Sequence, residues 1–157
     1  MPKPLKLYID TSVWNFAIEK RGEESLLVHR FLSNFSRKEL YKFFISDLVY
    51  GEVNEAHETR MKDLQNLLVY YKAENLEITE EVFTLSDKYL LNNVIPRNSF
   101  GDAVHIAVAT INHCEFLVSC NYKHMVSAKI IRGVHLVNKE EGYDLIEIMS
   151  PKEFVND

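Results

Sequence analysis

Three acidic residues that lie far apart in the sequence could form one reactive site. Asp10 follows the apolar run Leu5–Ile9, Glu52 lies in a helical segment after Tyr41–Ile45, and Asp102 begins another helical segment. Carboxylates held close together repel one another, and they tolerate this when they share protons or bind a hard cation such as Mg²⁺ or Mn²⁺. Such a site suits phosphodiester hydrolysis, because bound metal orients the attacking water, lowers its pKa and stabilises the leaving oxygen.

Asp102 is the acid whose surroundings point most directly to a special role. The residues after it, 103–109, are nearly all small or apolar, which predicts a helix buried on most sides. A carboxylate on such a helix is costly unless it is paired, placed at the helix start or bound to metal. His105, one turn further on, could be a ligand or a proton carrier, but we favour a hydrogen-bonded packing residue.

The other two acids each have a plainer alternative. Asp10 precedes Thr11 and Ser12 and could simply cap the next helix, because Asp is a preferred N-cap residue. Glu52 lies at the edge of an apolar helical stripe and could be a solvated surface residue. Glu55, one turn beyond Glu52, is a weaker candidate on a similar face.

Strands and helices alternate along the chain. Apolar runs of strand length occupy Leu5–Ile9, Tyr41–Ile45, Phe116–Val118 and Leu145–Met149, and a small polar or acidic residue follows each. Helices are expected at four places, which are the stripe Leu26, Leu27, Phe31, Leu32 and Phe35, the stripe Leu64, Leu67, Leu68 and Tyr71, and the segments Glu80–Leu91 and Asp102–Ile111. A last short helix is expected after Ser150, which caps it; Pro151 takes the first helical position and Glu153 completes a capping box. This predicts an α/β fold around a mainly parallel sheet, with the ligand site at the carboxyl ends of its strands.

The composition is that of one globular domain, which we expect to span residues 1–157. Of these residues 46% are hydrophobic, 26% are charged and the net charge is −5. No apolar run approaches the length of a membrane span and no signal-peptide pattern is present, so we expect a cytoplasmic protein. In that compartment Cys114 and Cys120 are expected to be free thiols, and their spacing to His113 and His124 does not favour a zinc site.

Four segments together carry a resemblance to a known family. These segments are Leu7–Ser12, Ile45–Val53, Gly101–Ala107 and Leu117–His124, and their order and spacing resemble the PIN domain, especially the prokaryotic PIN proteins that include VapC toxins. The tail from Gly142 to Phe154 is also similar. The resemblance implies a three-layer α/β/α fold with a central, mainly parallel sheet. It also implies a ribonuclease dependent on Mg²⁺ or Mn²⁺, an antitoxin protein as partner, and a homodimer.

Site residues follow from the same resemblance. It implies that Asp10 and Asp102 are metal ligands and that Glu52 acts through a metal-bound water or as a base. Asn121 occupies the place of the family's fourth acid. Because Asn offers a carbonyl ligand but no charge, we expect weaker metal binding, above all at a second metal position.

An RNA substrate needs hydroxyls and cations for its phosphates and aromatic side chains for its bases. Candidates near the expected edge are Thr11, Ser12, Ser46, Ser119, Lys123 and His124, with Arg97, Lys129 and Arg132 close by in the sequence. Trp14 could stack a base, but a core position is the plainer interpretation.

Three functions therefore remain open. The first is a metal-dependent endoribonuclease that acts as the toxin of a type II toxin–antitoxin pair. The second is a catalytically weak or silent PIN-like module that binds RNA or protein, which Asn121 keeps under consideration. The third, phosphoryl transfer through Asp10, is not favoured because the phosphatases that use a strand-end Asp place a second acid two residues later, where this chain has Ser12.

Overall fold

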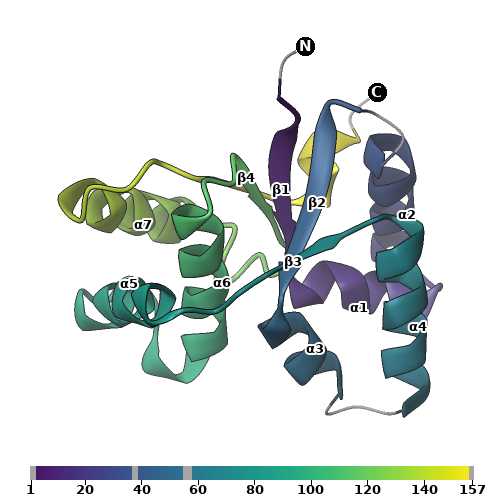
Figure 1. Ribbon diagram of the computed structural model, residues 1–157, viewed down its shortest axis with the longest axis horizontal. Helices are drawn as coiled ribbons and strands as arrows, with labels where there is room; N and C mark the ends of the chain where they lie inside the picture. The colour runs from purple at the N-terminus through teal and green to yellow at the C-terminus, as the bar shows by residue number, and fades with distance from the viewer. Residues whose placement is uncertain (1–2, 37–38, 55–57, 156–157) are drawn as a thin grey trace.

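A five-stranded sheet in which all neighbouring strands pair in parallel forms the centre of the molecule (Figure 1). The computed structural model describes residues 3–36, 39–54 and 58–155. The strands are β1 (Leu5–Ile9), β2 (Tyr41–Ser46), β3 (Glu74–Leu76), β4 (Phe116–Val118) and β5 (Glu147–Met149), and their order across the sheet is β3-β2-β1-β4-β5. The parallel sheet predicted from the sequence is confirmed.

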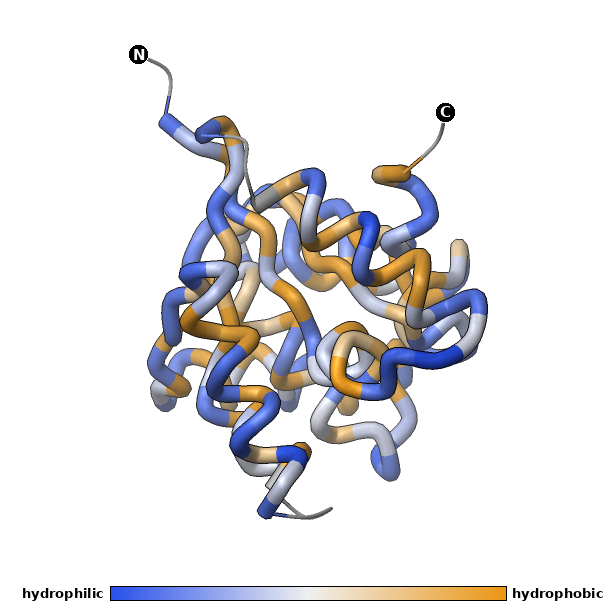
Figure 2. The backbone as a smooth tube through the Cα atoms, turned by 90° about the vertical axis from the view of Figure 1, so that its right-hand side faces the viewer, coloured by the Kyte–Doolittle hydropathy of each residue, from blue (hydrophilic) through white to orange (hydrophobic). Residues whose placement is uncertain are grey.

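Helices cover both faces of this sheet. Successive residues of β1 face opposite sides: Leu7 and Ile9 lie in one apolar cluster and Tyr8 lies in the other. The first cluster is closed by α1 (Thr11–Glu19), α2 (Glu23–Ser36), α3 (Asp47–Asn54) and α4 (Glu58–Tyr70). The second is closed by α5 (Glu80–Leu91), α6 (Phe100–Ile111) and α7 (Ala128–Glu140). The fold is therefore the expected three-layer α/β/α arrangement, and Figure 2 shows hydrophobic and hydrophilic residues alternating along its helices.

The strand order reverses between β1 and β4. The chain adds β2 and β3 on one side of β1 and later adds β4 and β5 on the other. Ile9 pairs with Val118, and the N–H of Asp10 donates to the Val118 carbonyl at 3.1 Å, so the two strands end together. In open α/β sheets such a reversal leaves a crevice outside the carboxyl ends of the strands.

Some expected elements differ from the observed ones. Leu26 is 62% exposed, and Val28 takes its place on the buried side of α2. The expected strand from Leu145 is shorter, because Leu145 is exposed and β5 begins at Glu147. The last helix is a 3₁₀ turn, η2 (Pro151–Phe154), in which the Ser150 side chain makes no capping bond, so the predicted capping box is wrong.

Strand β3 and helix α7 are among the elements that were not predicted. Strand β3 has the sequence Glu-Asn-Leu, so it lacks the apolar run by which the other strands are found. Helix α7 does carry a usable signal, because Ser127 caps it and its buried residues Ile130, Val134 and Val137 recur at helical spacing. Within the described part of the chain, no helix combines the length and the apolar character that crossing a membrane requires.

The close approach of α7 to Val94 yields a stability prediction. A Cβ added at Gly133 would lie 2.8 Å from Val94 Cγ1. We expect Gly133→Ala to lower the free energy of unfolding by about 1–2 kcal/mol in urea titrations, because overpacking outweighs the better helix propensity of Ala.

Gly51, in α3, is the matched control. No described atom lies within 4 Å of the Cβ that Ala would add there, so Gly51→Ala should stabilise by about 1 kcal/mol. Combining Gly133→Ala with Val94→Ala should remove the packing penalty. Equal stabilisation by Gly51→Ala and Gly133→Ala would show that α7 moves freely away from Val94, contrary to this expectation.

Candidate active site

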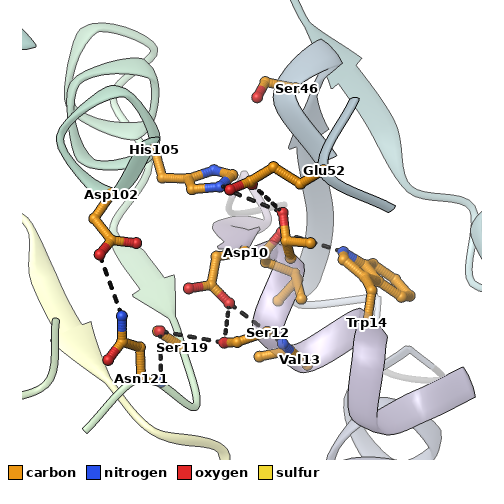
Figure 3. Close-up of polar contacts among 12 residues, drawn as sticks. Asp10, Ser12, Val13, Trp14, Ser46, Glu52, Asp102, His105, Ser119 and Asn121 are labelled. Carbon is orange, nitrogen blue, oxygen red and sulfur yellow. Dashed lines mark hydrogen bonds and ion pairs between the residues drawn. The ribbon is translucent and has the colours of Figure 1, made fainter. Parts of the chain in front are cut away.

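A pocket of about 350 Å³ lies at the carboxyl ends of β1 and β4. Its lining residues are Asp10, Thr11, Ser12, Asn15, Glu52, Asp102, His105 and Asn121. All four residues expected to take part in catalysis are among them, although they come from the segments after β1, within α3, within α6 and after β4. Figure 3 shows their side chains directed toward a common space. Among the residues that the structure describes, no Lys or Arg lines this pocket.

Asp10 both caps a helix and faces the pocket. Its Oδ1 atom accepts a hydrogen bond from the Ser12 hydroxyl at 2.5 Å and one from the N–H of Val13 at 3.3 Å, so the capping interpretation is confirmed. Only 3% of the residue is exposed. Burial raises the pKa of Asp10 above its ordinary value, while His105, Ser119 and Ser12 partly offset this effect. The carboxylate is thus held in place but remains costly to ionise.

Asp102 lies in the first turn of α6, opposite Asn121. The Asn121 Nδ2 atom donates to Asp102 Oδ2 at 3.2 Å, and the Asn121 Oδ1 atom accepts from the N–H of His124 at 3.1 Å. Because a backbone N–H can only donate, the amide oxygen must face His124 and the NH₂ group must face Asp102. Burial raises the pKa of Asp102 to about 6; His105 and His124 lower it, and the nearby charges of Asp10 and Glu52 raise it.

Glu52 is held by two donors. Its Oε1 atom accepts from Thr11 Oγ1 at 2.6 Å and lies 2.7 Å from His105 Nε2. Burial alone would raise the pKa of Glu52, but the hydrogen bond and charge of His105 and the Thr11 hydroxyl together lower it. Its Oε2 atom would be only 3.1 Å from a Cβ at position 101, so Gly101 leaves room for the carboxylate.

A chain of buried hydroxyls continues from His105 into the protein. The Tyr8 hydroxyl lies 2.7 Å from His105 Nδ1 and 2.7 Å from Ser46 Oγ. Because Nε2 faces the Glu52 carboxylate, Nε2 carries a proton; in the neutral ring Nδ1 then accepts from Tyr8, and Tyr8 accepts from Ser46. His105 is 2% exposed and both of its ring nitrogens have hydrogen-bond partners, as expected of a packing residue, but it also lines the pocket. Tyr8 was not predicted as a partner of His105, because the sequence of the strand does not show which residue its hydroxyl contacts.

Comparison with known proteins identifies the family of this chain. The sequence model of the PIN domain matches residues 7–128. The chain belongs to the PIN domain family. No curated protein matches the chain significantly by sequence.

Solved structures that resemble this PIN domain include two from VapC systems. One is a chain of VapBC2 from Rickettsia felis bound to a DNA fragment of its promoter, with 13% identity, a TM-score of 0.58 and coverage of 93% of this chain and 98% of that one. The other is VapC20 of Mycobacterium tuberculosis, described as a toxin that cleaves the sarcin–ricin loop, with 13% identity, a TM-score of 0.58 and coverage of 74% and 91%. At this identity the likeness concerns the fold.

The PIN domain does not bring every expected substrate-binding residue to the pocket. Thr11 and Ser12 line it, but their hydroxyls donate to Glu52 and Asp10. Ser46 and Ser119 are fully buried and do not line it. Lys123 and His124 line a separate cavity next to it. Trp14 is buried, and its Nε1 donates to the Ile9 carbonyl at 3.2 Å, so it belongs to the core as expected.

Asn15 is the lining residue that the sequence analysis missed. It lies one turn beyond Thr11 on α1, and its Oδ1 accepts from Arg60 at 2.9 Å. The helical spacing from Thr11 is the signal that could have found it. Glu55 lies outside the described residues.

The acids of the PIN domain pocket are not drawn together into a tight ligand cluster. Among the residues that the structure describes, no group of three His, Cys, Asp or Glu side chains is close enough to hold a metal ion. The two cysteines are free thiols, as expected, and lie in different core clusters.

The raised pKa of Asp102 predicts a pH-dependent difference in stability. A carboxyl group whose pKa is about 6 in the folded state, against 3.8 ordinarily, stabilises the fold most at low pH and loses that contribution as pH rises through this window. The Asp102→Asn variant has no such charge. We expect its melting temperature in EDTA to rise relative to wild type between pH 4.5 and pH 7.

Asp87→Asn, at an exposed position on α5, is the control for this measurement. Its melting temperature should follow that of wild type across the same range. A constant difference between Asp102→Asn and wild type would contradict the raised pKa.

Proposed function

We propose that this PIN domain protein is a Mg²⁺- or Mn²⁺-dependent endoribonuclease of the cytoplasm that hydrolyses RNA phosphodiester bonds. The observation that carries the proposal is the convergence of Asp10, Glu52 and Asp102 on one pocket, whose described lining contains no Lys or Arg. The fold shared with VapC20, which is described as a toxin that cleaves the sarcin–ricin loop, supports a toxin role.

The donor chemistry of the pocket fits a hard divalent cation. Carboxylate oxygens are the ligands that Mg²⁺ and Mn²⁺ prefer, and Asp10 and Asp102 would hold the ion. The pKa of Asp102 is raised in part by the charges of Asp10 and Glu52, which is the repulsion that a bound cation would relieve. When bound, the metal would activate the attacking water and stabilise the leaving oxygen.

The protein's own residues would position these groups. Ser12 orients Asp10 through its hydroxyl, and the Asn121 amide orients Asp102 through its NH₂ group. Thr11 and His105 hold Glu52 on the opposite wall, where it could accept a proton from water or contact metal-bound water. Asn121 thus supplies a hydrogen-bond donor where the family has an acid, and the site carries one negative charge less.

Loss of cleavage on substitution of the acids tests the proposal. Asp10→Asn, which keeps an acceptor for the helix cap, and Asp102→Asn should each lower the rate of cleavage of a mixed single-stranded RNA pool more than about 100-fold. EDTA should abolish cleavage by wild type.

Asp87→Asn serves again as the matched control and should cleave at the wild-type rate. Cleavage that survives in both active-site variants, or in EDTA, would show that another site or a contaminating nuclease is responsible.

The silent binding module is the second candidate, and Asn121 is the observation that favours it. Calorimetric titration with Mn²⁺ separates the two functions, since a nuclease site should bind the ion and lose that binding in Asp102→Asn. A folded protein that binds no Mn²⁺ at millimolar concentration and cuts no RNA would support the module.

Two partners belong to the toxin proposal. We infer an antitoxin protein, by analogy with the VapBC2 assembly, and a homodimer, which the sequence resemblance to the VapC-type PIN proteins implies. Sedimentation at tens of micromolar protein should give the mass of a dimer, and a monomer at that concentration would count against it.

A further inference from the structure

A second cavity of about 320 Å³ adjoins the acidic pocket and has the opposite charge. Arg97, Lys123, His124 and Lys129 line it, and its described lining contains no Asp or Glu. We call it the cationic pocket. Its composition contrasts with the chain as a whole, which carries a net charge of −5.

The same two segments line both pockets. In the segment 97–102, which leads from η1 (Arg97–Ser99) into α6, Arg97 lines the cationic pocket and Asp102 lines the acidic one. In the segment 121–124 after β4, Lys123 and His124 line the cationic pocket and Asn121 lines the acidic one. His124 is close enough to Asp102 to lower its pKa. A ligand that enters one pocket can therefore reach the other over a short path.

The cations of this pocket are available to a ligand. Within the described residues, Arg97, Lys123 and Lys129 form no ion pair, whereas Lys42 and Arg60 do. The first turn of α7 also faces the cavity through Ser127, Lys129 and Ile130. The positive end of a 13-residue helix adds to the attraction for an anion there.

We propose that the cationic pocket binds a backbone phosphate of the RNA strand next to the phosphodiester held in the acidic pocket. The proposal rests on the proposed nuclease function. The acidic pocket repels a polyanion, so a strand laid across it needs compensating cations close by. Among the described residues, the segments 97–102 and 121–124 and the first turn of α7 supply such cations in the adjoining cationic pocket. The contact is to phosphate, so it holds the strand without reading its sequence.

Salt-dependent binding tests this subsite separately from catalysis. The probe is a fluorescein-labelled single-stranded RNA oligonucleotide, and its anisotropy is titrated with protein in EDTA at several KCl concentrations, so no cleavage is needed. The Arg97→Ala, Lys129→Ala double variant should bind about 10-fold more weakly at 0.1 M salt. The magnitude of its slope of log K against log[salt] should be smaller by about 0.7, since one phosphate contact to a single strand contributes ~0.7.

Lys139→Ala is the matched control. Lys139 is exposed on α7, as Lys129 is, but lies in the last turn and outside the cationic pocket. Its affinity and salt slope should equal those of wild type. An unchanged affinity and slope in the double variant would overturn the proposal even if the protein cleaves RNA, and this is the outcome expected if the pocket takes an acidic segment of a protein partner instead.

Discussion

Repulsion between carboxylates that share one pocket is the constraint to which the rest of this site is adapted. Asp10 and Asp102 face one pocket from different elements, and burial raises the pKa of both. The structure offsets the cost locally with neutral donors, which are Ser12 and the N–H of Val13 at Asp10 and the Asn121 amide at Asp102. These donors orient the carboxylates without neutralising them, so the negative potential of the pocket is preserved for a cation.

The sheet topology makes this arrangement possible. Strands β1 and β4 end together, and the chain reverses its direction of strand addition between them, so the residues after both strands face an open edge. Glu52 and Asp102 reach the same edge from helices packed on opposite faces of the sheet. The relative position of the acids therefore depends on both core clusters, which links the geometry of the site to the packing of the whole domain.

The sequence predicts the acids better than it predicts their partners. Strand-end positions and the apolar helix after Asp102 place the four candidate residues at one edge, because these signals depend on local periodicity. Two features depend on how side chains from different elements are oriented: the role of Asn121 as a donor and the contact between Tyr8 and His105. Tyr8 and His105 are 97 residues apart in the sequence, and no local pattern encodes such an orientation. Strand β3 was missed for a related reason, since its pairing with β2 rests on backbone bonds.

The chain of hydroxyls behind His105 ends in the interior. Tyr8 and Ser46 are both inaccessible to solvent, so within the described residues this chain of hydroxyls does not connect the imidazole to bulk water. Any proton that the ring exchanges with bulk water must cross the pocket, past Glu52 and Thr11. A substrate that fills the pocket would therefore separate the His105 ring from bulk water on the side of Glu52 and Thr11.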